Sequence, residues 1–291
     1  MKIAAFRHHG QPGVGRISAD GRMVEPFQLP ADQAALGALP LVEAQAAGRA
    51  LPATGTAIPL AQVQLTAPVP RPRRNVFCVG KNYHAHAKEF AGSGFDSSAK
   101  SGGDIPAAPI IFSKVPESVI GPNDTIAIPA EVSTAIVYEA ELTVVIGQGG
   151  KGISKADAMK HVWGYTIIND MTARDWQGRH SQWLLGKSFD TFCPMGPWLV
   201  TADEMDGQNT DVKCWVNGEL RQDANTKDFI FDIPTLIECI SAGITLYPGD
   251  LIATGTPAGV GIGYKPPKYL KSGDVVKIEI GGIGVLENPL R

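Results

Sequence analysis

Closely spaced cysteines are missing from this sequence. Its 291 residues include only four cysteines, Cys78, Cys193, Cys214 and Cys239, which lie far apart and form no CxxC pair. Structural zinc sites and disulfide-rich secreted domains both depend on clustered cysteines. We therefore expect four reduced thiols that pack as small apolar side chains.

Long apolar runs and a strong charge are also missing. No stretch approaches the roughly 20 apolar residues that cross a bilayer, and the start has no long hydrophobic signal segment. We expect a cytoplasmic protein with no membrane partner. The net charge is only −3, and the one dense basic run, at residues 71–74, is too short for a nucleic-acid groove. We therefore expect no nucleic-acid partner.

The composition is that of a globular protein, and prolines divide the chain. Apolar residues make up 44% and charged residues 19%, which is ordinary for a folded domain. The proline-rich stretch at 68–72 predicts a boundary between a small N-terminal α/β domain, residues 1–70, and a catalytic domain, residues 71–291. In the first domain we expect a strand at 2–7, a hairpin through Asp20-Gly21 and a helix at 32–47.

Strand patterns dominate the rest of the chain. We expect strands at 135–146, 164–168, 198–201, 211–216, 251–254 and 275–280, and helices at 155–161 and 232–243, the second capped by Asp232. Asn217-Gly218 predicts a type I′ hairpin. Because no βαβ rhythm recurs, the fold class should be mixed α/β and mainly β. The Gly- and Ser-rich segment 90–106 is either an active-site lid or a surface excursion.

Two glutamates lie two residues apart in the alternating run AIVYEAELTVVIG. On a strand, Glu139 and Glu141 project from the same face. Two like charges repel unless a proton or a cation lies between them. Asp170, at the end of the strand pattern WGYTIIND, would complete an all-oxygen site that favours Mg²⁺ or Mn²⁺ over Zn²⁺. An exposed strand face and a turn-capping aspartate are the alternative interpretations.

A histidine and a glutamate are spaced for a general base in GKNYHAHAKE. On a helix His86 and Glu89 share a face, so the carboxylate could orient one imidazole nitrogen and leave the other free to take a proton. Two unrelated surface residues would show the same spacing. His84 is a second candidate. Within the sequence, only the three-residue spacing from Glu89 favours His86.

Two further segments could contact an anionic substrate. Lys187 follows a glycine that lets the backbone approach closely, and its charge could neutralise an oxo acid. Thr256, in the glycine-rich turn ATGTPAG, could hold a carboxylate together with backbone N–H groups. A solvated lysine and a purely structural turn are the alternatives.

Five ordered strings resemble the fumarylacetoacetate hydrolase (FAH) family: GKNYHAHAKE, YEAELTVVIG, GYTIINDMTARDWQ, LLGKSFDTFCPMGPWL and LIATGTPAGVG. The match spans residue 72 to the C-terminus. Within the family, this part of the chain most resembles members that act on acylpyruvates and oxaloacetate. It implies an FAH-type β-roll catalytic domain, usually in a homodimer. His84 is a departure, since a small residue is expected there.

The resemblance also implies roles for individual residues. It places a divalent metal, Mg²⁺ or Mn²⁺ with Ca²⁺ a possible occupant in crystals, on Glu139, Glu141 and Asp170. It assigns catalysis to His86, Glu89 and Lys187. Substrate contacts are expected from Tyr83, Arg174, Gln177, Lys187 and Thr256.

The expected activity is metal-dependent hydrolysis of a C–C bond in a 1,3-diketo acid of the acylpyruvate, fumarylpyruvate or 2,4-diketo acid type. Such a reaction would release pyruvate or a related oxo acid in aromatic or sugar acid catabolism. His86 with Glu89 would activate water, and the metal with Lys187 would stabilise the enolate. The alternative is an oxaloacetate-type decarboxylase or an oxo-dienoate isomerase or hydratase, which should tolerate loss of His86. A non-catalytic ligand-binding module is a remote third reading.

Overall fold

Strands build most of the structure, a computed structural model that describes residues 1–92, 94 and 105–291. The strands are β1 (Lys2–His8), β2 (Gln11–Ile17), β3 (Met23–Pro26), β4 (Ile58–Pro59), β5 (Gln64–Thr66), β6 (Val76–Gly80), β7 (Ile110–Lys114), β8 (Val119–Ile120), β9 (Ile136–Val137), β10 (Ala140–Ile146), β11 (Val162–Asn169), β12 (Thr172–Ala173), β13 (Cys193–Thr201), β14 (Asp211–Val216), β15 (Glu219–Asn225), β16 (Leu251–Ala253), β17 (Val275–Ile280) and β18 (Gly284–Pro289).

Helices are short by comparison. The α-helices are α1 (Ala31–Ala34), α2 (Leu39–Ala46), α3 (His84–Ala91), α4 (Arg174–Arg179), α5 (Leu184–Lys187) and α6 (Ile233–Ser241). Single 3-10 turns are η1 (Leu60–Gln62), η2 (Pro116–Ser118), η3 (Ala158–His161), η4 (Thr226–Asp228) and η5 (Gly261–Gly263). The predicted class, mixed α/β and mainly β, is confirmed. Among the described residues, no helix has both the length and the apolar character to cross a membrane.

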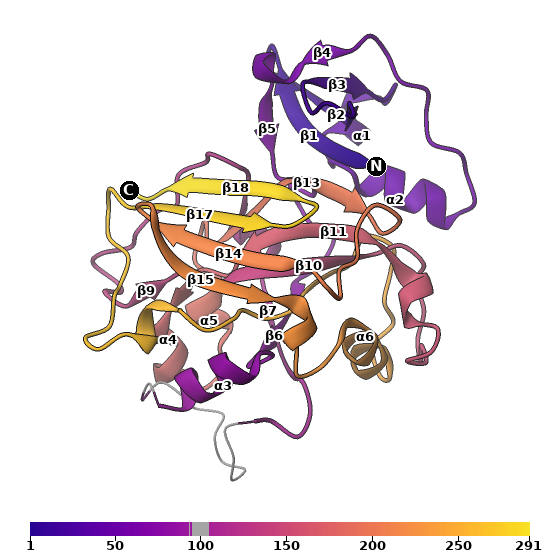
Figure 1. The fold of residues 1–291 in the computed structure, drawn as a ribbon. Coiled ribbons are helices and arrows are strands. Elements are labelled where there is room, and N and C mark those ends of the chain that lie inside the picture. The colour runs from indigo at the N-terminus through magenta and orange to yellow at the C-terminus, as the bar shows by residue number, and fades with distance from the viewer. Residues whose placement is uncertain (93, 95–104) are drawn as a thin grey trace.

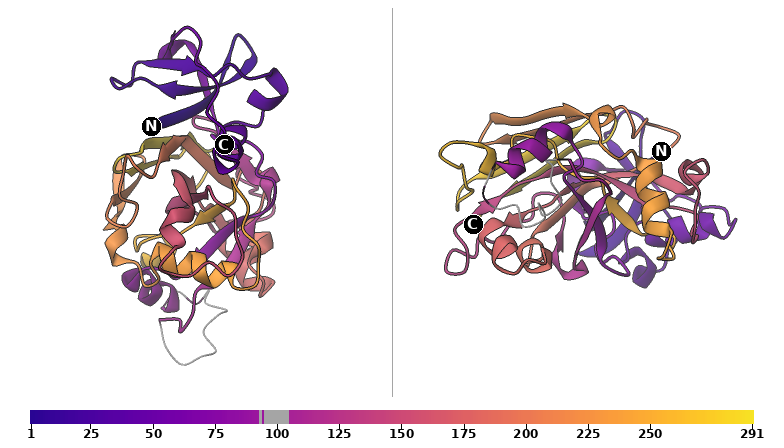
Figure 2. Two further views of the ribbon diagram at one scale, coloured as in Figure 1. Left: turned by 90° about the vertical axis from the view of Figure 1, so that its right-hand side faces the viewer. Right: turned by 90° about the horizontal axis from the view of Figure 1, so that it is seen from below.

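One 12-stranded sheet runs through the molecule in the order β4-β3-β2-β1-β13-β11-β10-β16-β6-β7, with β5 beside β1 and β8 beside β13. A four-stranded sheet, β15-β14-β17-β18, packs near it (Figure 1). The strands curve around a common interior in the second orientation (left view of Figure 2). Every residue of β10 and β11 is buried, so any polar side chain on these two strands lies in the interior.

The first 66 residues form a unit to one side of the larger body, drawn in indigo in Figure 1. Its strand β1 hydrogen-bonds antiparallel to β13, which belongs to the larger body. The boundary proposed at residue 70 stays a prediction. The expected hairpin through Asp20-Gly21 is confirmed by the antiparallel pairing of β2 with β3.

Local signals explain several elements. Asn217 and Gly218 both have positive φ, as a type I′ turn requires, and join β14 to β15 as expected. Helix α6 begins after Asp232, whose carboxylate accepts a hydrogen bond from the Thr235 N–H at 2.9 Å. Both predictions are confirmed, although α6 ends at Ser241, two residues before Gly243.

Three predicted elements are shorter or interrupted. The helix expected at 32–47 is broken into α1 and α2, because Gly37 adopts a positive φ and its backbone lies against Pro68. The helix expected at 155–161 is only the 3-10 turn η3. The strand expected at 135–146 is split into β9 and β10, which leaves Glu139 between them. The predicted lid, 90–106, lies mostly outside the described residues.

Candidate active site

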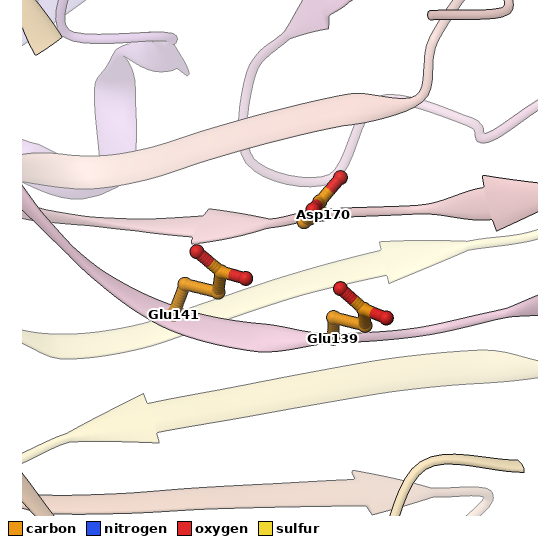
Figure 3. Close-up of side chains that lie close together, drawn as sticks. All are labelled: Glu139, Glu141 and Asp170. Atoms are coloured by element: carbon orange, nitrogen blue, oxygen red, sulfur yellow. The ribbon is translucent and has the colours of Figure 1, made fainter. Parts of the chain in front are cut away.

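Three carboxylates meet at the paired ends of β10 and β11. Glu139, Glu141 and Asp170 are buried, and one oxygen of each lies within 4.8 Å of the others. Pairing of Ala140 with Asn169 brings the strands together there, and the Asp170 N–H donates to the Glu139 carbonyl at 2.8 Å. Figure 3 shows both glutamates rising from the same side of their strand toward Asp170. The expected shared face is therefore observed, although Glu139 lies just outside β10.

Three buried cations surround these carboxylates. The Lys187 ammonium lies 2.7 Å from Glu139 Oε2 and 2.6 Å from Asp170 Oδ2. Lys114 Nζ lies 2.7 Å from Asp170 Oδ1, and the Arg174 guanidinium pairs with Glu139 Oε1. Every one of these side chains is almost completely buried, so the ion pairs form in a low-dielectric interior.

Glu141 differs from the other two carboxylates, because no lysine or arginine among the described residues forms an ion pair with it. Its carboxylate accepts a hydrogen bond from the Gly255 N–H at 2.9 Å. Burial raises the pKa of Glu141 well above its ordinary value, and the charges of Asp170 and Glu139 raise it further. Burial also opposes ionisation of Glu139, but Arg174 and Lys187 together outweigh it and hold that pKa at about 2.

This donor set fits a divalent cation. All three groups offer hard oxygen ligands. No direct ion pair among the described residues offsets the burial of Glu141, and the charge of Lys187 lowers its pKa too little to outweigh that burial. A bound ion would lower the pKa of Glu141 and would relieve the repulsion among the three carboxylates. The buried Glu-Glu-Asp triad is thus consistent with a divalent metal, as the sequence led us to expect.

The histidine and glutamate of the predicted dyad meet on α3. His86 Nδ1 lies 3.0 Å from Glu89 Oε2, and the other carboxylate oxygen accepts from the Gly259 N–H at 3.0 Å. His86 is 4% exposed, which excludes the surface-helix interpretation, whereas His84 is exposed. Spacing favoured His86 and the family resemblance assigned the role to it, and His86 is the histidine that contacts Glu89.

A small cavity connects His86 of the dyad with Glu139 and Glu141. The residues that line it are Val79, Gly80, Lys81, His86, Phe90, Phe112, Glu139, Glu141, Arg174, Gln177, Trp183, Lys187 and Thr256. Aromatic rings form one wall, with the Phe112 and Trp183 centroids 5.1 Å apart. This wall makes the cavity apolar on one side and strongly polar on the other, as is usual for small-molecule sites.

Two buried donors in the cavity wall have no partner within the described part of the chain. Arg174 Nη1 donates to Gln177 Oε1 at 2.9 Å, which orients the Gln177 amide. Gln177 Nε2 and Arg174 Nε then remain without a hydrogen bond among the described residues. Buried donors are rarely left unpaired in native proteins, so these two indicate a ligand with acceptor atoms.

Tyr83 is the one predicted substrate contact that does not line this cavity. Its ring packs at 4.9 Å from the Phe229 ring in an edge-on arrangement, and burial raises its pKa. Thr256 does line the cavity, and its hydroxyl accepts a hydrogen bond from Gln222 Nε2 at 2.7 Å.

Two contributors were missed by sequence reasoning. Lys114 ends β7 and reaches Asp170 across 56 positions of sequence, and Gln222 reaches Thr256 from β15. A lysine closing an apolar strand, IIFSK, was the only local signal for the first. No local pattern distinguishes Gln222 from the other polar residues of its strand.

Comparisons with known proteins agree with this geometry. The family model described as fumarylacetoacetate (FAA) hydrolase C-terminal matches residues 75–291. Oxaloacetate tautomerase YisK of Bacillus subtilis (strain 168) is 50% identical over 232 residues, which cover 79% of this chain and 74% of that protein. Mitochondrial oxaloacetate tautomerase FAHD2A of Homo sapiens is 47% identical over 245 residues, covering 83% and 74%.

The fold is shared with solved structures as well. The fumarylacetoacetate hydrolase from psychrophilic Exiguobacterium antarcticum superposes with a TM-score of 0.83 at 39% identity, covering 100% of this chain and 99% of that one. The FAH-type fold expected from the sequence is thereby confirmed. The chain, with its buried carboxylate triad, belongs to the fumarylacetoacetate hydrolase family of enzymes.

Proposed function

We propose that this enzyme interconverts the enol and keto forms of oxaloacetate, with Mg²⁺ or Mn²⁺ held by Glu139, Glu141 and Asp170. The two tautomerases described above support this activity. Carbon–carbon bond hydrolysis was the first expectation from sequence, and an isomerase or decarboxylase was the alternative. The relatives favour the alternative, and two of them are named as oxaloacetate tautomerases.

The observation that best supports the proposal is a set of buried hydrogen-bond donors around the cavity that have no partner among the described residues. The lining of this cavity combines cationic and amide side chains with aromatic rings, which suits a small oxo acid. Arg174 Nε and Gln177 Nε2 supply donors for its oxygens. No group beyond a proton carrier and an electron sink is required for tautomerisation.

A divalent cation would supply a Lewis acid that polarises the C2 oxygen of the substrate. The protein would supply the proton transfer. When the keto form reacts, the C3–H bond breaks, its proton moves to His86 Nε2, and the electron pair forms the C2=C3 double bond as charge develops on the C2 oxygen. That oxygen then takes a proton from a water molecule, and protonated His86 gives its proton to the hydroxide that remains, so that the base is regenerated.

Each side chain has a defined part in this step. Glu89 holds His86 Nδ1, so the free Nε2 is available for the proton. Lys187 remains an ammonium, because Asp170 and Glu139 outweigh the effect of burial and raise its pKa. Its charge would stabilise the developing oxyanion in a site shielded from bulk water. Since the proposed reaction requires proton transfer at C3, loss of His86 should impair it, contrary to our first expectation for an isomerase.

Rapid mixing of enol oxaloacetate with enzyme tests the proposal. The ultraviolet absorbance of the enol should decay faster with enzyme and Mg²⁺ than with buffer, and EDTA should abolish the difference. Formation of pyruvate from oxaloacetate would instead indicate a decarboxylase. Cleavage of acylpyruvates with no effect on the enol would indicate a hydrolase and would overturn the proposal.

Homodimer formation and cytoplasmic location are kept as predictions. Size-exclusion chromatography with light scattering tests the first, and fractionation of cells that express the tagged chain tests the second.

A further inference from the structure

One buried amide side chain connects the metal-binding strand to the threonine of the glycine-rich turn. Gln222, on β15, is 1% exposed. Its Oε1 accepts from the N–H of Ala140, the residue between Glu139 and Glu141, at 3.1 Å. Its Nε2 donates to Thr256 Oγ1 at 2.7 Å and to the Pro257 carbonyl at 2.8 Å.

The orientation of this amide follows from its partners. The Ala140 N–H can only donate, so it must face the amide oxygen. The Pro257 carbonyl can only accept, so it must face the amide nitrogen. An inverted amide would place two acceptors together on one side and two donors on the other, and both hydrogen bonds would be lost.

The hydroxyl of Thr256 is therefore the acceptor in its contact with Gln222. Its own proton must point elsewhere, and no acceptor for it is found in the described part of the chain. Thr256 lines the cavity beside Glu141, Gln177 and Lys187. A ligand oxygen is the partner that this free O–H bond fits.

Neighbouring hydrogen bonds keep the turn in place. Thr254 Oγ1 donates to the Leu142 carbonyl at 2.7 Å, and Asn82 Nδ2 donates to the Thr254 carbonyl at 2.7 Å. Gly255 adopts a φ of +102°, which other residues rarely adopt, and its N–H donates to Glu141 Oε2. These hydrogen bonds hold the backbone just before Thr256. The contact with Gln222 therefore mainly determines the direction of the Thr256 O–H bond.

We propose that Gln222 is a positioning residue that makes the Thr256 hydroxyl an obligatory donor to a carboxylate oxygen of the bound oxo acid. The inference rests on the proposed function for the identity of the ligand, but not for the reaction. A non-reacting dicarboxylate therefore tests it independently of tautomerase activity.

The test is calorimetric titration of oxalate into enzyme saturated with Mg²⁺, after the Mg²⁺ affinity of each variant has been measured separately. Thr256→Val should raise the oxalate Kd roughly ten-fold, the usual effect of one lost hydrogen bond to a charged group. Thr256→Ser should bind like wild type. Gln222→Met should also raise the oxalate Kd roughly ten-fold. The double variant, with both substitutions, should bind oxalate no more weakly than Thr256→Val alone.

A near-isosteric variant guards against simple misfolding. Gln222→Glu keeps an acceptor for the Ala140 N–H, but a carboxyl group has no pair of N–H donors to serve both the Pro257 carbonyl and Thr256, so oxalate binding should weaken. As a matched control, Asn288→Met removes another buried amide, one that donates to the Gly121 and Asp124 carbonyls at 2.9 Å. It should lower the melting temperature and leave the oxalate Kd unchanged.

Two results would overturn the inference: wild-type oxalate affinity in Gln222→Met, or independent, multiplying losses in the double variant. If the single and double variants bind oxalate as expected while the enzyme does not consume enol oxaloacetate, the positioning role of Gln222 stands and the proposed reaction fails.

Discussion

Replacing Lys114 with methionine is the most direct test of how the carboxylate cluster is held together. The Lys114 ammonium is completely buried and donates to Asp170 Oδ1 at 2.7 Å, to the Met171 carbonyl at 3.1 Å and to the Lys187 carbonyl. Methionine has a similar volume but no charge and no donor. Asp170 Oδ1 and two backbone carbonyls would then be buried without this partner.

Breaking one side of a buried ion pair typically costs about 3–5 kcal/mol. At about 2 °C per kcal/mol for a chain of this size, the melting temperature should fall by about 6–10 °C. The Asp170 charge would keep only the Lys187 ammonium, 2.6 Å from its second oxygen. We therefore expect Mg²⁺ affinity to fall as well, because Asp170 loses the contact that orients it.

Thermal unfolding in EDTA, followed by calorimetric Mg²⁺ titration, measures both effects. Lys213→Met is the matched control, since Lys213 is 39% exposed and lies 3.8 Å from Asp223. A surface pair of this kind contributes at most about 1 kcal/mol. If the Lys114 variant melted within 2 °C of this control, the buried ion pair would not support the site as we describe it.

Three shorter predictions concern other ionisable groups. In EDTA at neutral pH, Glu141→Gln should raise the melting temperature, because the raised pKa of Glu141 makes its ionisation unfavourable in the metal-free fold. The same variant should abolish the shift in melting temperature that Mg²⁺ causes in the wild type. A lower melting temperature in EDTA would contradict this. Because the pKa of Glu139 is held at about 2, its charge stabilises the fold above pH 4.5, and this contribution of about 3 kcal/mol should be lost as pH falls toward 2. Urea unfolding of wild type and Glu139→Gln at several pH values should show the two converging in acid. Of the four cysteines only Cys239 is exposed, so Ellman's reagent should modify one thiol quickly in the native protein and four in denaturant.

Local chemistry accounts for what the sequence predicted well. Asn217-Gly218 favours one turn geometry in any context, and Asp232 can cap a helix through its own side chain. The pairing of His86 with Glu89 also depends only on one helical turn. Long-range contacts were needed where predictions fell short, as at Gly37, whose approach to Pro68 interrupts the helix expected at 32–47.

Residue types and ordered motifs were enough to identify the two glutamates, the aspartate, the dyad and Lys187, and with them the chemistry that this chain could carry. The balance of their charges depends on the folded structure. Lys114 and Gln222 reach the site from strands far away in the chain, and electrostatic and hydrogen-bond energies depend on distance in space rather than in sequence. Among the described residues Glu141 is buried without a direct ion pair, which is the strongest structural argument for a metal and could be seen only once the strands were paired.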